Sequence, residues 1–146
     1  MFLQKLSLKN FRCYENLDID FKERTTLLVA VNGQGKTTVL DSIRIALWPY
    51  ISQFDLARTK YADPANTITI DDVRTIKKLN EGNLEMARQL PSSITVTCDF
   101  EDKKITWKRL RDSEARRSQT KDDSHTKKLK EYASNMQKNI RNFEQD

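Results

Sequence analysis

The chain begins with two segments in which hydrophobic and polar residues alternate, the pattern of strands with one polar face. The hydrophobic residues are Phe2, Leu3, Leu6, Leu8 and Phe11 in the first segment, and Leu17, Ile19 and Phe21 in the second. Residues 25–31 then form a nearly continuous hydrophobic run of strand length, which is typical of a strand covered on both faces. A glycine-containing turn follows. Hydrophobic residues then recur at helical spacing as far as Trp48-Pro49, where we expect the helix to end.

The middle of the chain has a weaker pattern. Residues 50–67 show no strong period and contain a proline, so we expect a loop with a short helical turn. Asp71-Asp72 is able to cap a short helix that runs to Leu79, with Gly82 marking its end.

A β-hairpin, a linker and a helix are predicted for the C-terminal part. Residues 93–111 contain two alternating segments around a charged turn, which indicates an antiparallel hairpin. Residues 112–125 are polar and charged, so we expect a flexible linker. Residues 126–146 form an amphipathic helix, whose hydrophobic stripe is Leu129, Ala133, Met136, Ile140 and Phe143. Two heptads are too few for a coiled coil, so we expect the stripe to pack on its own domain, on further sequence or on a second copy.

Composition and charge narrow the class of protein only slightly. The 146 residues suit one modest domain, and 26 basic against 21 acidic residues give a net charge of +5. The basic excess is spread evenly along the chain, so the sequence permits DNA as a partner without requiring it. Lys104, Lys108, Arg109 and Arg111 make one end of the hairpin basic, as either a solvated edge or a DNA contact. With no hydrophobic run of membrane-spanning length and only two cysteines, we expect a cytoplasmic protein.

The segment 30–38 reads Ala-Val-Asn-Gly-Gln-Gly-Lys-Thr-Thr and matches a phosphate-binding P-loop. Its glycines allow successive backbone N–H groups to turn toward phosphate oxygens. We expect Lys36 to contact the β- and γ-phosphates, Thr37 to ligate Mg²⁺ through its hydroxyl, and Thr38 to reach an α-phosphate oxygen. The following helix adds the positive end of its dipole to the same site. The predicted nucleotide-binding residues of the loop are Asn32, Gly33, Gln34, Gly35, Lys36, Thr37 and Thr38.

Four features together resemble one family of ATPases. They are the opening segment Leu8-Lys9-Asn10-Phe11-Arg12, the Asn-Gly-x-Gly-Lys form of the P-loop, Val39-Leu40-Asp41-Ser42-Ile43 after it, and the hairpin 93–111. This combination resembles the heads of RecF-, SMC- and OLD-type ABC ATPases and of the Rad-type break-repair ATPases, proteins also described as AAA ATPases. Beyond residue 112 the chain is similar to bacterial defence-type ATPases, including those that accompany retrons or HNH nucleases.

The resemblance implies a fold, cofactors and one further site residue. It implies an α/β P-loop N-lobe, in which the P-loop strand and helix are flanked by an antiparallel β-subdomain. It also implies ATP and Mg²⁺ as cofactors, and an arginine, here Arg12, that approaches the nucleotide.

Two motifs of these ATPases do not occur in the sequence, namely a Leu-Ser-Gly-Gly-like signature and a Walker B Asp-Glu after four hydrophobic residues. The segment most similar to a Walker B motif is 96–101. Threonine interrupts its hydrophobic residues, so Asp99 is better explained as a solvent-facing acid on a hairpin strand. The resemblance implies that both motifs lie beyond Asp146. We therefore expect an incomplete, N-terminal lobe in which no catalytic residue is identified.

Three functions remain open from the sequence. The first is an ATP-gated ATPase of DNA repair or anti-phage defence that contacts DNA and controls a nuclease partner. For this class the resemblance implies two heads that enclose two ATP molecules, in a homodimer or a higher oligomer. The second is a nucleotide-binding scaffold without turnover. The third is another P-loop enzyme, such as a small kinase, although a kinase would not explain the opening Asn-Phe-Arg strand.

Overall fold

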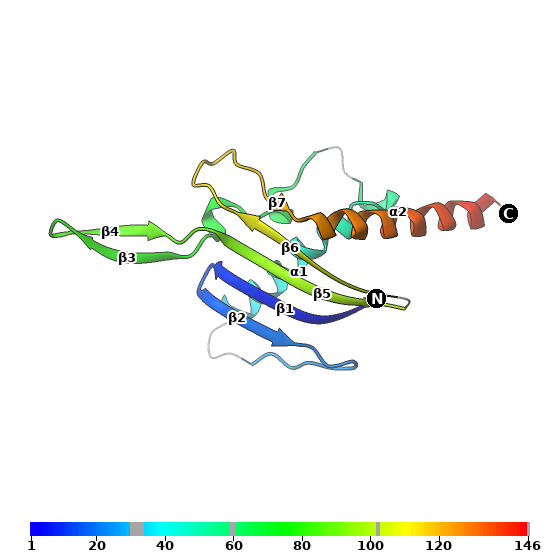
Figure 1. Ribbon diagram of the computed structural model, residues 1–146, viewed down its shortest axis with the longest axis horizontal. Coiled ribbons are helices and arrows are strands. Elements are labelled where there is room, and N and C mark those ends of the chain that lie inside the picture. The colour runs from blue at the N-terminus through cyan, green and yellow to red at the C-terminus, as the bar shows by residue number, and fades with distance from the viewer. Residues whose placement is uncertain (30–33, 59–60, 102, 146) are drawn as a thin grey trace.

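The computed structural model describes residues 1–29, 34–58, 61–101 and 103–145, and its main element is an antiparallel sheet (Figure 1). The strand order is β2-β1-β5-β6-β7. The strands are β1 (Phe2–Phe11), β2 (Tyr14–Asp20), β5 (Ser92–Phe100), β6 (Lys103–Arg111) and β7 (Lys121–Asp122). The two predicted N-terminal strands are confirmed as β1 and β2, and the hairpin over 93–111 is present as β5 and β6.

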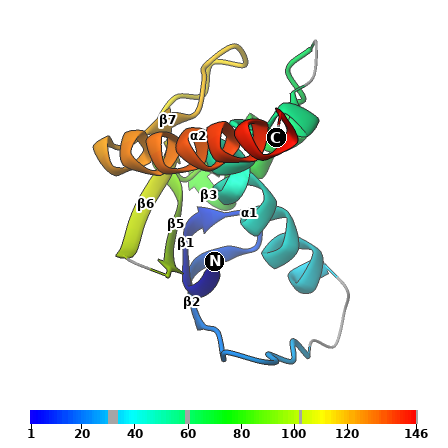
Figure 2. The same ribbon diagram turned by 90° about the vertical axis from the view of Figure 1, so that its right-hand side faces the viewer.

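The sheet has one hydrophobic face, because side chains alternate between its two sides. In β5, Ile94, Val96 and Cys98 are buried, whereas the intervening threonines are partly exposed. Helices α1 (Gln34–Ile51) and α2 (Ser124–Gln145) supply the other side of the core, through residues that include Ala46 and Leu129 (Figure 2). The sheet and the two helices therefore form one layered unit.

Helix α1 does not end at Trp48-Pro49 as predicted, because it continues through Pro49 to Ile51. Proline lacks the N–H that would bond the carbonyl four residues earlier, here that of Ile45. The Ile45 carbonyl instead accepts a hydrogen bond from Nη1 of Arg109 at 2.6 Å. A side chain from the sheet therefore satisfies the carbonyl that the proline leaves unpaired.

Two of the four basic residues at this end of the hairpin are buried, which corrects both interpretations for Arg109 and Arg111, whereas Lys104 is exposed and Lys108 partly exposed. The two arginine side chains are 5% and 2% exposed, and they lie on the core face of β6 beside Trp107. Arg109 donates to the carbonyls of Ile45 and Asn66 and forms an ion pair with Asp122. Arg111 donates to backbone carbonyls that include that of Ser118, at 2.9 Å. Buried guanidinium groups of this kind hold loops onto the sheet and are not available to DNA.

The predicted strand at 25–31 is wrong in its described part. Residues 25–29 form no strand, and the side chains of Leu27 and Val29 are each 82% exposed, although Leu28 packs on the core. A strand needs the N–H and C=O groups of a neighbouring strand, and no described strand pairs with this segment.

The predicted fold class, an α/β P-loop N-lobe, is met only in part. The structure combines helices with strands, but every strand pair within the described ranges is antiparallel.

The predicted helix at 71–79 is also wrong. A single 3-10 turn covers Ile70–Asp72, and a hairpin of β3 (Thr75–Asn80) and β4 (Asn83–Arg88) follows. At the tip of this hairpin, Glu81 and Gly82 have φ values of 48° and 81°, as the tight turn of a two-residue hairpin requires. The hairpin projects from one end of the molecule (Figure 1).

The polar segment 112–125 includes β7 and the first two residues of α2. Several of its groups hold it against the body: the Thr120 hydroxyl accepts from the Ile68 N–H, and Asp122 pairs with Arg109. Asp123 accepts from the N–H and hydroxyl of Thr126, and so caps the start of α2. His125, the second residue of α2, is exposed.

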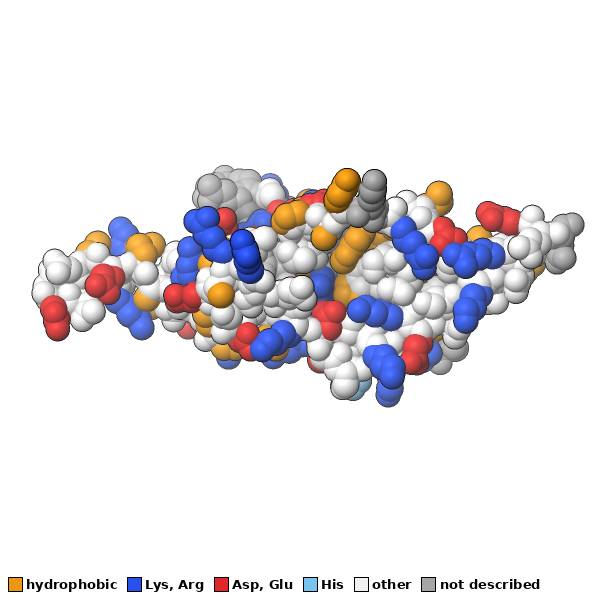
Figure 3. Space-filling view, turned by 90° about the horizontal axis from the view of Figure 1, so that it is seen from above, with side chains coloured by type: hydrophobic (Ala, Val, Ile, Leu, Met, Phe, Trp, Pro, Cys, Tyr) orange, Lys and Arg blue, Asp and Glu red, His pale blue; other side chains and the backbone are white. Residues whose placement is uncertain are grey.

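The outer surface carries charges of both signs. Lys and Arg side chains are interspersed with Asp and Glu over the face in Figure 3, which agrees with the even spread of charge along the sequence. Among the described residues, no helix is long and apolar enough to cross a membrane.

Candidate nucleotide-binding site

The predicted P-loop leads into the N-terminus of α1. Ala30 to Gly33, and with them the predicted site residues Asn32 and Gly33, lie outside the described residues. Gln34 is the first residue of α1, and Gly35, Lys36 and Thr37 complete its first turn. Lys36 is half-buried, Thr37 is exposed and Thr38 is 3% exposed. The helix therefore presents a lysine and a hydroxyl at the end where its dipole is positive.

The described part of the loop fits a phosphate group. The first turn of α1 contains no acidic residue, so nothing there opposes an anion. At Gly35 an added Cβ would lie 2.7 Å from the hydroxyl oxygen of Tyr14. A side chain at this position would therefore require the Tyr14 hydroxyl to move.

Tyr14 is a site residue that the sequence analysis missed. It belongs to β2, and its hydroxyl lies against the start of α1. A hollow of about 290 Å³ opens there, lined by residues of β2, by Leu27 to Val29 and by Gly35, Lys36 and Val39. Apolar surface thus borders the cationic start of the helix. No sequence signal identifies Tyr14, since its approach to Gly35 depends on how β2 and α1 pack.

Arg12, which is predicted to approach the nucleotide, contacts α1. Its Nη1 is 2.7 Å from Oδ2 of Asp41, and its Nε is 2.9 Å from Oδ1 of Asp72. Thr37 and Asp41 are four residues apart in α1, so they share a helix face. Asp41, which binds Arg12, is therefore about one helical turn, roughly 6 Å, from Thr37 along the axis.

The local backbone and charges fix the position of Arg12. The residue has φ = 49°, a left-handed conformation that non-glycine residues rarely adopt, and it follows β1 directly. Its N–H donates to the Asp72 carbonyl at 2.7 Å. Burial disfavours the charge of the guanidinium, but hydrogen bonds and charges of Asp41 and Asp72 outweigh this effect and raise the pKa of Arg12. Arg12 thus stays charged and joins α1 to the segment before β3.

Asp72 was predicted to cap a helix and has a different role. Its Oδ2 accepts from the N–H and the hydroxyl of Thr69, at 2.8 and 2.9 Å, while Oδ1 binds Arg12. Its side chain is 10% exposed. Asp72 is thus a second residue that sequence reasoning did not connect with the site.

Thr37 is the single residue predicted to ligate Mg²⁺. Over the described ranges, no group of three or more His, Cys, Asp or Glu side chains is placed to hold a metal ion. Asp99, the acid of the Walker B imitation, accepts a hydrogen bond from Gln4 at 3.2 Å and lies opposite Lys104 in the sheet. This position agrees with a hairpin acid rather than a magnesium ligand.

The start of α1 is the candidate nucleotide site, and comparison with known proteins gives the family. A family model described as "AAA domain" matches residues 5–146, so the chain belongs to the AAA domain family.

Curated relatives match a short part of the chain. It is 47% identical over 45 residues to the DNA replication and repair protein RecF of Exiguobacterium sp., covering 31% of this chain and 12% of the relative. The RecF protein of Leptospira interrogans is 46% identical over 48 residues, 33% of this chain and 13% of the relative. Uncharacterized protein 050L of Invertebrate iridescent virus 6 is 48% identical over 44 residues, 30% of this chain and 4% of that protein. These matches span well under a fifth of each relative's length. Together with the family model, they confirm the resemblance to the N-terminal region of RecF- and SMC-like ATPases.

Proposed function

We propose that this chain is the ATP-binding N-terminal part of an ABC-type, RecF/SMC/OLD-like ATPase that acts in DNA repair or anti-phage defence. The observation that carries the proposal is the start of α1, where Gly35, Lys36 and Thr37 form an acid-free first turn against Tyr14. Membership of the AAA domain family and the similarity to RecF proteins support it.

The residues of this chain would bind and orient the phosphates. Lys36 would balance the charge of the terminal phosphates, and the Thr37 hydroxyl would ligate Mg²⁺. Bound Mg²⁺ would supply positive charge that neutralises the phosphate oxygens. Asn32, Gly33, Gln34 and Gly35 would offer backbone N–H groups, and Thr38 would lie at the α-phosphate.

Arg12 would donate a hydrogen bond to a phosphate oxygen while it keeps its ion pair with Asp41 of α1. Its Nε and Nη1 are used by Asp72 and Asp41, whereas Nη2 has no hydrogen-bond partner within the described residues. An arginine carries five N–H donors, so a donor remains for a phosphate oxygen. The hollow beside Tyr14 offers apolar surface suited to the rest of a nucleotide.

The remaining parts of the proposal concern the whole protein. DNA and a nuclease are its proposed partners, a homodimer or higher oligomer is its proposed assembly, and the cytoplasm its proposed location. Residues 1–111 would form the P-loop N-lobe, 112–125 a linker and 126–146 a helix that packs on it. A nucleotide-binding scaffold without turnover is the second candidate, because the 146 residues contain neither a signature motif nor a Walker B motif.

Removal of the Lys36 charge tests the proposal. Lys36→Ala leaves the helix intact but removes the cation that faces the terminal phosphates. Affinity for a fluorescent ATP analogue with Mg²⁺, measured by equilibrium titration, should fall at least tenfold, about 1.4 kcal/mol. Lys78→Ala, an exposed change on the projecting hairpin, is the matched control and should leave affinity unchanged. An unaltered affinity in folded Lys36→Ala protein would overturn the P-loop assignment.

A further inference from the structure

Strand β6 presents an open edge to α2. On one side, β6 pairs with β5 along its whole length, from Lys103 to Arg111. On the other side it pairs with β7 only at Arg109 and Leu110. Within the described residues, no strand covers the remaining edge between Lys103 and Lys108.

The hydrogen bonds of Lys108 show which backbone groups face this edge. Its N–H donates to the Asp123 carboxylate at 3.1 Å, and its carbonyl accepts from the Asp123 N–H at 3.2 Å. In a strand, the N–H and C=O of every second residue point to the same side. The backbone groups of Thr106 and Lys104 therefore point to the open edge as well. They are placed to bond a further strand.

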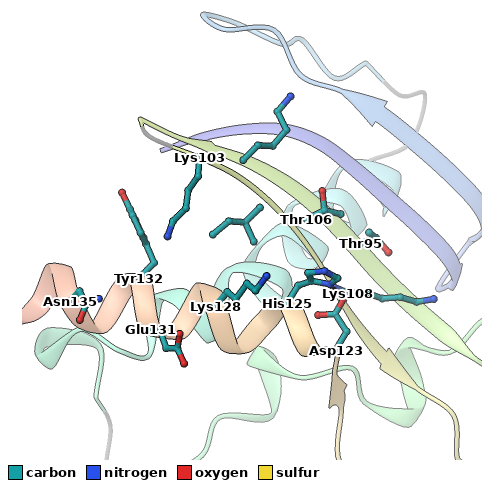
Figure 4. A pocket seen from close by; sticks show the side chains of 12 residues that line it. Thr95, Lys103, Thr106, Lys108, Asp123, His125, Lys128, Glu131, Tyr132 and Asn135 are labelled. Carbon is teal, nitrogen blue, oxygen red and sulfur yellow. Dashed lines mark hydrogen bonds and ion pairs between the residues drawn. The ribbon is translucent and has the colours of Figure 1, made fainter.

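A groove separates this edge from α2. It has a volume of about 720 Å³ and is lined on one side by Lys103 to Thr106 and Lys108 of β6, together with Thr95 of β5. On the other side, residues of α2 spaced three or four apart, which include His125, Lys128 and Tyr132, face it. Figure 4 shows Lys103 of the strand directed toward Tyr132 of the helix, whereas Lys108 and Glu131 point away from the space between them. The Lys103 ammonium lies 4.8 Å from the centre of the Tyr132 ring.

Asp123 closes one end of the groove. Its carboxylate binds the Lys108 N–H on one oxygen and caps α2 through Thr126 on the other. This junction fixes the distance between the end of β6 and the first turn of α2. The open edge, about five residues or roughly 16 Å long, therefore has a fixed wall opposite it.

The charge of the groove is positive. Lys103, Lys104, Lys108 and Lys128 line it, against Asp123 and Glu131. None of the four lysines forms an ion pair within the described residues. The Asp123 carboxylate is already occupied by backbone and hydroxyl donors. The lining thus favours a ligand with negative charge.

We propose that this groove binds an acidic peptide segment in extended conformation, which adds to β6 as a strand. The open backbone groups of Lys104 and Thr106 match a peptide main chain, whereas the sugar-phosphate chain of a nucleic acid lacks the alternating donors and acceptors. The lysines select carboxylate side chains along the segment. The binding partner is therefore a protein segment rich in Asp or Glu.

Binding is tested with a fluorescein-labelled peptide of eight alternating glutamates and threonines, followed by fluorescence anisotropy with the full chain. Lys104→Glu with Lys108→Glu should weaken binding about tenfold, because it reverses two charges of the groove. Lys77→Glu with Lys78→Glu, on the distant hairpin, makes the same change in net charge and should have no effect.

The contribution of the backbone is tested separately. Thr106→Pro removes an edge N–H that β5 does not use and should weaken binding about fivefold, the loss of one hydrogen bond. Thr106→Val keeps that N–H, removes only the hydroxyl bond to Thr97, and should bind normally. The same peptide with every backbone nitrogen methylated retains its charge and should bind at least tenfold more weakly to the unaltered chain.

Three results would overturn the proposal. The first is the absence of saturable binding of the acidic peptide. The second is equal binding of the methylated peptide, which would leave only charge attraction. The third is displacement of the peptide by single-stranded oligothymidine at a tenfold lower concentration than by unlabelled peptide, which would assign the groove to nucleic acid. All three readouts are independent of ATP, so they do not test the P-loop.

Discussion

Positively charged residues of this chain serve in two different environments. Arg109 and Arg111 are buried and bind backbone carbonyls, whereas Lys36 lies in the first turn of α1, where an anion would be stabilised, and Arg12 binds Asp41 farther along the same helix. In the sequence all four are simply basic residues. Their surroundings give Arg109 a structural role, whereas for Lys36 we propose a role toward a phosphate ligand.

Replacement of Arg109 should destabilise the fold strongly. Arg109→Met keeps the length of the side chain but leaves the carbonyls of Ile45 and Asn66 and the carboxylate of Asp122 without their donor. Loss of one partner from a buried ionic network costs about 3–5 kcal/mol. Urea denaturation followed by circular dichroism should show a free energy of unfolding reduced by about this amount.

The adjacent residue provides the control for this experiment. Lys108→Met changes the same charge on the opposite face of β6, where the side chain reaches the surface. Its effect on the free energy of unfolding should stay within about 0.5 kcal/mol. Similar destabilisation by the two substitutions would contradict the structural role of Arg109.

Thr37 should affect ATP binding only through the metal ion. Thr37→Val preserves the shape of the side chain but removes the proposed Mg²⁺ ligand. Affinity for the ATP analogue should therefore decrease with Mg²⁺ present and remain nearly constant in EDTA. Calorimetric titration under both conditions measures the difference. An equal loss in both would show that the substitution damages the loop itself.

At the scale of elements, α2 has two unlike halves. Its first half buries Leu129 and Ala133 against the sheet and α1, whereas its last turns extend past the sheet (Figure 1). There Met136, Ile140 and Phe143 are 38%, 42% and 82% exposed. The predicted hydrophobic stripe is therefore covered over only part of its length.

The exposed half of the stripe should cause self-association of the isolated chain. Sedimentation velocity over a range of protein concentrations should detect it. Met136→Glu with Ile140→Lys should relieve it, because the pair places charges on the stripe. Asn135→Glu with Asn139→Lys introduces the same charges at exposed polar positions and should not. A chain that stays monomeric at all concentrations would contradict the prediction.

At the scale of the whole molecule, we expect ATP binding without ATP turnover. The chain contains the residues expected to hold phosphates but no signature motif and no Walker B acid. We therefore expect ATP turnover at or near background, even at high protein concentration. Phosphate release measured over a concentration series, with Lys36→Ala as the blank, tests this. Robust turnover that depends on Lys36 would place a catalytic acid within these residues, with Asp99 and Glu101 the first candidates.

Local patterns were sufficient for the elements whose partners lie close in the sequence. β1 and β2 are adjacent along the chain, as are β5 and β6, so alternation predicted the first two as strands and the second two as a hairpin. The same reasoning failed for 71–79, where the spacing of Val73, Ile76 and Leu79 imitates a helix. There the positive φ values at Glu81 and Gly82 favour a hairpin turn, and the N–H of Arg74 bonds the carbonyl of Asn10.

The sequence by itself determined the N-terminal strands and the amphipathic character of α2, because these depend on the order of neighbouring residues. It also predicted the P-loop, which stays a prediction. Only the tertiary structure decided which polar groups meet. It joined Arg12 to Asp41 and Asp72, placed Tyr14 against Gly35, and buried Arg109 beneath the carbonyl that Pro49 leaves unpaired. It also left residues 25–29 without a described strand partner, although their composition suits a buried strand. Hydrophobicity shows that a segment is able to be buried, but the partner that buries it lies elsewhere in the chain or outside it.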